Sequence, residues 1–204
     1  YGYIWTGLDE SGKDTYQDMD NSGTIDGSDR RVIGKATPDF TVGWNNTLTY
    51  KNWDLNLFFN GAFGADRLNL ARFTMASMVG DSRFITLREA YTDNFDKVGQ
   101  SAIYPGLKVA GNNYQAVSTK WVEDASYVRL ENISLSYNLS KKVTKFADIR
   151  LTLSCQNLFT ITGYKGMDPV GTTFSNDNVD VDAGIDMGAY PTPRTFTFGM
   201  RMNF

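Results

Sequence analysis

The chain of 204 residues contains no histidine and only one cysteine. Without histidine, these residues cannot form a Ser-His-Asp or Cys-His catalytic arrangement, or a histidine-ligated zinc or haem site. Cys155 has no second cysteine for a disulfide, and it falls among the apolar positions of its segment, so we expect a packed or lipid-facing thiol. A net charge of −3 offers no basic face for nucleic acid. We therefore expect neither an enzyme nor a nucleic-acid-binding protein.

Long hydrophobic runs are also missing, since no apolar stretch approaches the roughly 20 residues of a membrane-spanning helix. Several segments instead alternate between apolar and polar residues. The last ten residues, TFTFGMRMNF, put apolar side chains on one face of a strand and polar ones on the other. This pattern is typical of an outer-membrane barrel strand, although a soluble sandwich strand also alternates. We predict a lipid-facing terminal strand in which the apolar set is Phe196, Phe198, Met200, Met202 and Phe204.

Four further segments alternate in the same way, at residues 40–50, 53–63, 133–139 and 149–156. Each is close to the ~9–11 residues that a tilted transmembrane strand needs. In the third segment the apolar parity changes upstream of Ile133. A bulge near Asn132 would account for this change, and so would a strand that has already left the membrane. Residues Tyr1 to Trp5 could supply the outer end of a sixth strand.

The links between these segments alternate between short and long. Lys51-Asn52 forms a two-residue turn, and residues 140–148 form a short link that contains three lysines. The links from Gly64 to about Ser126 and from Thr160 to about Pro193 are long. Outer-membrane barrels combine short periplasmic turns with long extracellular loops. At the short-turn end we expect an aromatic girdle that consists of Tyr50, Trp53, Tyr137 and Phe204. Within the first long loop we expect short helices over 67–78 and 85–95.

One loop has the residue spacing of a twelve-residue calcium site. It runs from Asp18 to Asp29, with Gly23 at the position of the sharp turn. Its last position is Asp where Glu is usual, and its flanks do not have the pattern of paired helices. We therefore predict a structural Ca²⁺ site and not a calcium switch, against the alternative of a solvated, turn-rich loop without an ion. The candidate ligands are Asp18, Asp20, Ser22, Thr24, Asp26 and Asp29.

Other polar and aromatic residues are weaker candidates for ligand contact. The chain from Lys165 to Asp168 and Arg194 could touch a ligand, but such charges are more often solvated. No pair of the many carboxylates stands out as acid and base, so no catalytic residue is predicted. Aromatic residues of the long loops could stack on sugar rings, although packing within the loop is the commoner role; they are Phe73, Phe84, Tyr91, Tyr114, Trp121, Tyr164 and Phe174.

Several motifs together resemble the C-terminal part of SusC-like TonB-dependent transporters, the SusC/RagA family. They occur in the family's order and cover most of the chain; they are YGYIWTG, YQDMDNSGTIDGSDRRVIGKATPDF, YKNWDLNLFFNGAFG, SYVRLENISLSYNL, NLFTITGYKGMDP and YPTPRTFTFGMRMNF. The departures are Val170, where the family often has an acidic residue, and a diffuse match over 64–111.

The resemblance implies an all-β fold: the C-terminal strands of a transmembrane barrel of about 22 strands, with long extracellular loops that carry short helices. Five strands cannot close a barrel, so residues 1–204 would be the C-terminal portion of one barrel domain, without its plug. Residues 13–34 would be an extracellular, calcium-loop-like segment.

The implied function is import of oligosaccharides or peptides through the outer membrane of a Gram-negative, Bacteroidetes-like bacterium. The implied partners are a SusD-like lipoprotein lid, the rest of the barrel and plug, TonB through the missing N-terminal part, the barrel-assembly machinery and outer-membrane lipid. Two alternatives stay open: another outer-membrane barrel, such as a porin or adhesin, and a soluble, calcium-stabilised β-sandwich that binds glycans.

Overall fold

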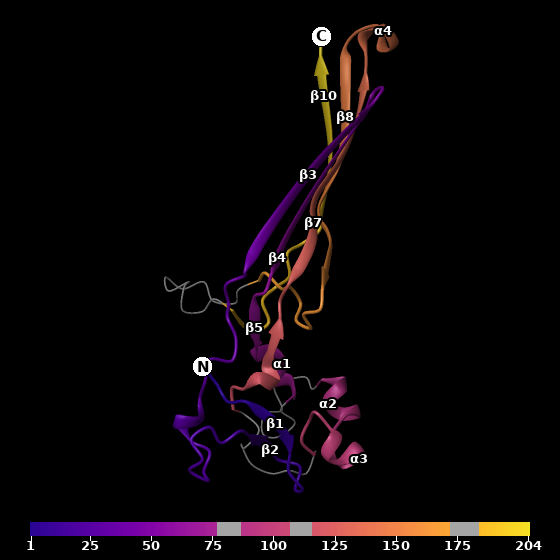
Figure 1. Cartoon of the computed structure of the whole chain (residues 1–204). Helices are drawn as coiled ribbons and strands as arrows, with labels where there is room; N and C mark the ends of the chain where they lie inside the picture. Colours follow the sequence, from indigo (N-terminus) through magenta and orange to yellow (C-terminus); the bar gives the residue numbers. More distant parts are fainter. Residues whose placement is uncertain (77–86, 107–115, 172–183) are drawn as a thin grey trace.

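The computed structural model describes residues 1–76, 87–106, 116–171 and 184–204. Its main feature is a long antiparallel sheet of five strands in the order β10-β8-β7-β4-β3 (Figure 1). All five predicted strands are confirmed, and two of them extend beyond the predicted bounds. The strands are β3 (Phe40–Tyr50), β4 (Trp53–Phe63), β7 (Tyr127–Leu139), β8 (Asp148–Thr162) and β10 (Thr195–Asn203).

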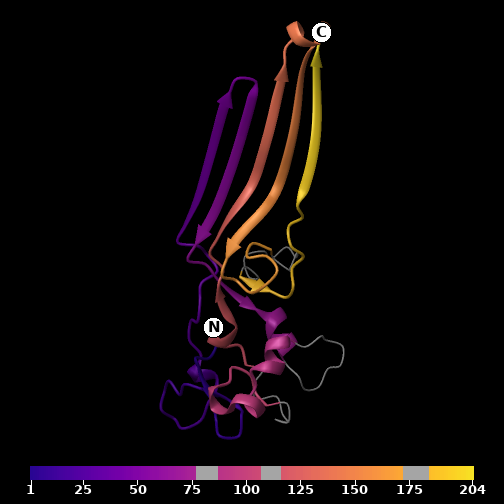
Figure 2. The same ribbon diagram turned by 90° about the vertical axis from the view of Figure 1, so that its right-hand side faces the viewer.

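The two short links lie at one end of this sheet. Tyr50 pairs with Trp53 across a two-residue turn, in which Lys51 takes a positive φ of 53°. The second link contains the short helix α4 (Lys141–Thr144), which ends at Lys145 in the left-handed conformation. Figure 2 shows both links and the C-terminus at the same end of the sheet, with the remaining elements gathered at the opposite end.

Of the two explanations for the parity change in β7, the bulge is confirmed. The register with β4 shifts between Phe58 and Phe59, and the register with β8 shifts between Leu130 and Asn132. Glu131 is the additional residue, so Leu130 and Ile133 lie on the same face although their spacing is odd. The apolar parity of the sheet therefore continues through the irregular part of the sequence.

The long links form a second region at the end opposite the short turns. A three-stranded sheet in the order β6-β5-β9 lies there, made of β5 (Asp66–Asn69), β6 (Val122–Asp124) and β9 (Ile185–Asp186). The helical elements around it are α1 (Leu70–Ala76), α2 (Arg88–Thr92), α3 (Phe95–Val98), η1 (Gly27–Asp29), η2 (Gly99–Ser101) and η3 (Thr119–Trp121). Short helices in the first long link were therefore predicted correctly. Within the described ranges, no helix is both long and apolar enough to span a membrane.

The helix predicted for 67–78 begins later, because Asp66–Asn69 pairs as a strand with β6 and β9. Residues 77 and 78 lie outside the described residues. The helix predicted for 85–95 is interrupted: α2 ends at Thr92, and a separate turn, α3, begins at Phe95.

The expected sixth strand is not observed in the five-stranded sheet. Gly2 and Tyr3 instead form isolated bridges with Arg31 and Ser118. Further along, β1 (Trp5–Leu8) pairs with β2 (Asp14–Tyr16) in a separate two-stranded sheet. The bridges of Gly2 and Tyr3 and the β1–β2 hairpin therefore take the hydrogen-bonding groups that a barrel strand would have used.

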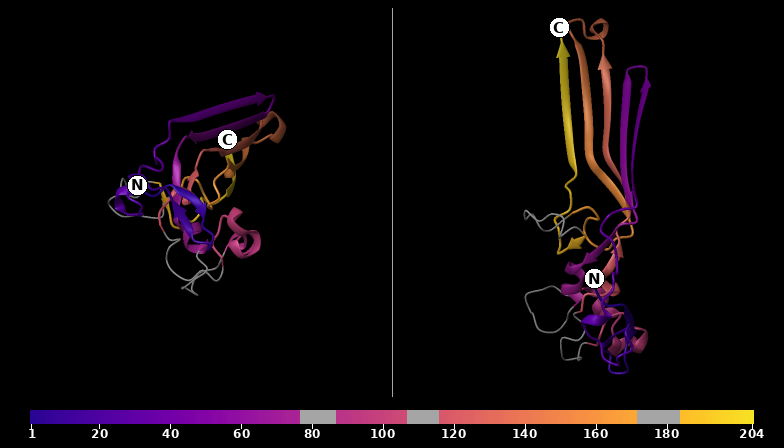
Figure 3. Two further views of the ribbon diagram at one scale, coloured as in Figure 1. Left: turned by 60° about the horizontal axis from the view of Figure 1, so that its bottom comes forward. Right: turned by 60° about the vertical axis from the view of Figure 1, so that its left-hand side comes forward.

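A small buried cluster stabilises the loop region. Trp121 and Tyr104 are its largest members, exposed by only 4% and 2%. Phe73 contacts the Trp121 ring edge to face, with a centroid separation of 5.4 Å. The right-hand view in Figure 3 shows the loop region at the end of the sheet opposite the C-terminus.

Candidate functional site

The first functional feature is the apolar face of the five-stranded sheet. Register places Phe198 opposite Leu153 and Met200 opposite Leu151, so apolar residues form continuous rows across the strands. Phe198 is 70% exposed and Met200 is 57% exposed, so these rows are not part of a closed protein interior. Such a large exposed apolar surface needs apolar surroundings. This agrees with the predicted lipid-facing strand, while contact with lipid itself stays a prediction.

The aromatic residues predicted to form a girdle lie at the short-turn end. Tyr50 pairs with Trp53, which pairs in turn with Tyr137 on the next strand. The Trp53 and Tyr137 rings are in contact, with centroids 4.5 Å apart. Phe204 follows the end of β10 and is 88% exposed.

Cys155 is buried, unlike most residues of the apolar face, and it pairs with Ile133 on one side and Phe196 on the other.

The opposite face of the sheet is polar and is connected by side-chain hydrogen bonds. The Ser136 and Thr152 hydroxyls lie 2.9 Å apart on neighbouring strands. Asp54 accepts a hydrogen bond from the Asn138 amide at 3.0 Å and pairs with Arg150 at 3.1 Å. A face of this kind suits a water-filled lumen.

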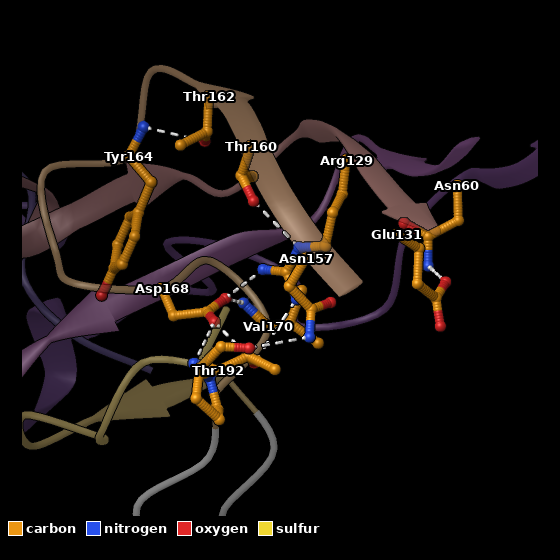
Figure 4. A network of polar contacts seen from close by, with 12 residues as sticks. Asn60, Arg129, Glu131, Asn157, Thr160, Thr162, Tyr164, Asp168, Val170 and Thr192 are labelled. Carbon is orange, nitrogen blue, oxygen red and sulfur yellow. Dashed lines mark hydrogen bonds and ion pairs between the residues drawn. The ribbon is translucent and has the colours of Figure 1, made fainter. Parts of the chain in front are cut away.

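Near the loop end of this polar face, Arg129 of β7 binds Asp168. Their side chains are 2.7 Å apart and only 8% and 3% exposed (Figure 4). Asp168 also accepts hydrogen bonds from the backbone N–H groups of Val170 at 2.9 Å and Thr192 at 3.0 Å. The Arg129 Nε donates in addition to the Thr160 hydroxyl. We call Arg129, Asp168, Val170 and Thr192 the loop anchor, because they attach both ends of the last long link to the sheet.

The loop anchor favours an ionised Asp168. Burial alone would raise the pKa of this carboxyl group, but the N–H groups of Thr192 and Val170 and the Arg129 guanidinium hold its pKa below the usual range. Nearby, the Tyr164 hydroxyl donates to Asp186 at 2.6 Å, and burial raises the pKa of Tyr164. Asp168, a weak candidate for ligand contact that was expected more often to be solvated, is instead buried in an internal ion pair.

A second buried ion pair lies in the loop region. The Lys120 ammonium and an Asp14 carboxylate oxygen are 2.8 Å apart, with side chains exposed by 2% and 0%. Burial raises the pKa of Asp14 and lowers that of Lys120, while each partner opposes the shift of the other. The Trp5 indole N–H donates to the same Asp14 oxygen at 2.6 Å. This pair joins the β1–β2 hairpin to the chain before β6.

Most of the described loop aromatics pack within the protein. Trp121 belongs to the buried cluster, Phe73 packs against it, and Tyr164 is 6% exposed. Tyr91 is 55% exposed, and the Lys97 ammonium lies over its ring at 3.7 Å from the centroid. The remaining three candidates, Phe84, Tyr114 and Phe174, lie outside the described residues.

The acidic loop brings together three of its four candidate carboxylates. Carboxylate oxygens of Asp18, Asp20 and Asp29 lie within 4.8 Å of one another. Asp29 is fully buried and accepts backbone N–H groups of Met19 at 2.7 Å and Asp26 at 2.8 Å. Hydrogen bonding by the backbone N–H of Gly23 is the main cause that lowers the pKa of Asp18. The loop is therefore curled around its carboxylates.

The other three candidate ligands have different contacts. The Asp26 carboxylate caps η1 by accepting the Ser28 N–H at 2.7 Å, and it lies outside the three-carboxylate group. The Ser22 hydroxyl donates to the Thr24 carbonyl at 3.0 Å. As predicted, the described flanks are not a helix pair: the short strand β2 precedes the loop, and irregular chain follows η1.

Sequence reasoning missed the loop anchor and the Asp14–Lys120 pair. Arg129 lies on the polar side of its strand, but nothing in the spacing relates it to Asp168, 39 positions away. Asp14 and Lys120 are 106 positions apart. The sequence holds only a weak indication of these contacts, namely charged residues within or beside strands that otherwise alternate between apolar and polar residues.

Comparison with known proteins gives clear relatives. No family model matches the chain. It is 36% identical over 98% of its length to "TonB-dependent receptor P3" of Formosa agariphila, and covers 20% of that protein. It is 28% identical over 96% of its length to "TonB-dependent receptor SusC" of Bacteroides thetaiotaomicron, and covers 18% of that protein. The chain thus spans about a fifth of these curated relatives, which are named as receptors and not as enzymes.

Solved structures give the same fold. The structure of the RagAB peptide transporter matches with a TM-score of 0.80 and 20% identity, over 100% of this chain and 22% of the matched chain. RagAB in its open-open state matches with a TM-score of 0.79. At this identity the structural match concerns the fold alone. Together with the sequence relatives, it shows that the chain is a homologue of SusC-like TonB-dependent receptors and has the fold of their C-terminal β-barrel part.

Proposed function

We propose that this chain forms wall and outer loops of a TonB-dependent importer in the outer membrane of a Bacteroidetes-like bacterium. The importer takes up oligosaccharides or peptides together with a SusD-like lipoprotein lid. TonB acts through parts of the whole protein that precede this stretch, and the barrel-assembly machinery inserts the barrel. The observation that carries the proposal is the five-stranded sheet with one exposed apolar face and one hydrogen-bonded polar face.

The strand dimensions support a membrane position. β3 and β4 each have 11 residues, which corresponds to a length of about 36 Å at ~3.3 Å per residue. Tilted by about 45°, such strands cover roughly 25 Å, the height of the apolar band of an outer-membrane barrel. A soluble sandwich would need a second sheet over the apolar face. Among the described residues that face stays open, and the relatives favour an importer over a porin or adhesin.

Two arginine substitutions in β10 test the membrane position in the full-length receptor. Phe198→Arg places a charge on the apolar face, at a general cost of about 2–4 kcal/mol near the bilayer midplane. Thr197→Arg places the same charge on the polar face, one residue away. We expect Phe198→Arg to reduce the heat-modifiable, membrane-extracted form on gels, and Thr197→Arg to retain it. Equal tolerance of both, or loss with Thr197→Arg alone, would overturn the assigned faces.

Import and partners need a separate experiment. Affinity purification of the full-length receptor from native membranes should recover a SusD-like lipoprotein in stoichiometric amount. Uptake of a labelled oligosaccharide or peptide mixture should stop when the receptor gene is deleted or when the proton gradient is collapsed. Uptake that continues after both treatments would refute the importer function, even if the barrel is confirmed.

We also propose that the acidic loop holds a structural Ca²⁺ ion. The three converging carboxylates of Asp18, Asp20 and Asp29 support this, because hard cations prefer several oxygens held by a curled chain. Ca²⁺ should protect the loop of the full-length receptor from protease, and a chelator should remove the protection. The double variant D18N/D20N should lose the calcium effect, whereas D26N should keep it, because Asp26 lies outside the group. Protection that does not depend on Ca²⁺ would leave the loop as a turn-rich segment without an ion.

A further inference from the structure

The short link between β7 and β8 has an unusual composition. Residues 140–147 read SKKVTKFA and contain three lysines and no acidic residue, within a chain whose net charge is −3. All three lysines are exposed. Two large apolar side chains beside them, Val143 and Phe146, are 67% and 56% exposed. We call this segment the basic turn.

The backbone of the basic turn is closed by hydrogen bonds, while its three lysines, Val143 and Phe146 stay exposed. The Lys145 N–H donates to the Lys141 carbonyl at 2.8 Å, and Lys145 takes the left-handed conformation. The Lys141 N–H donates to the Asp148 carboxylate at 2.5 Å, and the Thr144 hydroxyl bonds the Ala147 carbonyl. Ala147 is fully buried beneath the turn. The exposed apolar side chains are therefore not a consequence of an open, unsatisfied loop.

The position of the basic turn continues the apolar face of the sheet. Leu139 and Ile149, which flank the turn, pair with each other and share the apolar parity of β7 and β8. Figures 1 and 2 show α4 beside the C-terminus, at the end of the sheet where the Trp53 and Tyr137 rings meet. Tryptophan and tyrosine favour the level of lipid headgroups. The lysines therefore lie at the end of the sheet just beyond its apolar rows, next to these rings.

We propose that the basic turn binds anionic phospholipid headgroups of the membrane leaflet at the short-turn end; this rests on the proposed membrane position. Val143 and Phe146 reach the boundary between acyl chains and headgroups. Lys141, Lys142 and Lys145 extend beyond it, with their apolar stems along the boundary and their charges toward phosphate. The positive charge complements an anionic lipid surface, and the exposed apolar pair distinguishes such a surface from a soluble acidic partner.

The test uses the full-length receptor reconstituted with phosphatidylethanolamine and phosphatidylglycerol. Electron spin resonance with spin-labelled forms of each lipid measures the selectivity of the protein for phosphatidylglycerol. The triple variant K141Q/K142Q/K145Q removes the charges of the basic turn. K13Q/K35Q/K97Q removes the same charge from the loop region and serves as the matched control. A lysine near an anionic surface contributes roughly a fivefold preference, so the triple variant should lose a large part of the selectivity.

Two further measurements complete the test. Heat-modifiable migration confirms first that each variant is inserted. F146S retains all three lysines but removes the apolar contact, and it should lower the selectivity without a change in charge.

The outcomes are distinct. Selectivity lost in the K141Q/K142Q/K145Q variant and retained in the control supports the proposal. An equal loss of selectivity in the triple variant and in the control would show that the overall charge of the protein attracts the lipid, and this would overturn the proposal. Unchanged selectivity in both, as expected if an acidic protein occupies the turn, would also overturn it. A wild-type receptor that inserts but shows no preference refutes this inference alone, whereas one that does not insert refutes the membrane position as well.

Discussion

Replacement of Asp168 by Asn should detach the loop anchor without unfolding the sheet. The substitution keeps the side-chain shape but removes the charge opposite the Arg129 guanidinium. It also leaves one acceptor oxygen for the N–H groups of Val170 and Thr192, which both use the carboxylate in the wild-type chain. Arg129 is then left buried without its counter-charge, which is the costly situation for an ion pair.

The magnitude follows from burial. Loss of one partner of a buried ion pair costs about 3–5 kcal/mol, and the small exposure of both side chains leaves little solvent screening. A cost of about 3 kcal/mol corresponds to opening that is more frequent by roughly a hundredfold. The cost should be local, because the strand pairing of β7 with β8 does not involve Asp168.

Hydrogen exchange of the full-length receptor in detergent measures this directly. The Val170 and Thr192 amides donate to Asp168, so peptides covering them should exchange about a hundredfold faster in D168N. D39N is the matched control, because the Lys35–Asp39 pair is more than half exposed on both sides and contributes little. Exchange that is unchanged in D168N, or accelerated equally in D39N, would refute the reasoning.

Three further predictions concern other parts of the chain. The pKa of Asp168 in the folded chain lies below its usual value of 3.8, so the stability that Asp168 gives to the loop anchor should be fully present above pH 3.8. This stability should be lost as the pH falls through the lowered pKa, and hydrogen exchange of the loop anchor at pH 5 and pH 3 measures the loss. Gly61→Val should reduce the heat-modifiable folded form, because a side chain there would meet the Tyr127 carbonyl at 2.8 Å; Gly199→Val, with its nearest atoms at 4.0 Å, should not. Trp121→Ala should cost about 3–5 kcal/mol locally and expose the loop region to protease, whereas Tyr91→Ala, at an exposed ring, should leave the cleavage rate nearly unchanged.

Much of the sheet could be predicted from local pattern. Alternation in 40–50 and 53–63 fixed which residues share a face, and Lys51-Asn52 marked the turn between them. The parity change before Ile133 indicated the bulge as one of two explanations, because a single additional residue keeps Leu130 and Ile133 on one face. These features depend on neighbours in the sequence, so the sequence contains them directly.

The loop region could not be predicted in the same way. The expected sixth strand did not form because Gly2 and Tyr3 bridge to Arg31 and Ser118, and Trp5 pairs in the β1–β2 hairpin. Of the four carboxylates predicted to bind calcium, three come together, and the fourth, Asp26, caps η1 instead. The spacing of the residues indicates which oxygens could converge on an ion, but the folded backbone determines which of them come together.

The amino-acid sequence by itself determined the strands, their two faces and the alternation of short and long links, because side-chain periodicity and turn chemistry act over a few residues. Only the tertiary structure decided that Arg129 holds Asp168, that Lys120 is buried against Asp14, and that Trp121 lies inside a cluster. These contacts join residues that are far apart in the chain. A buried charge is stable only beside a partner, and no local sequence pattern identifies which residue that partner is.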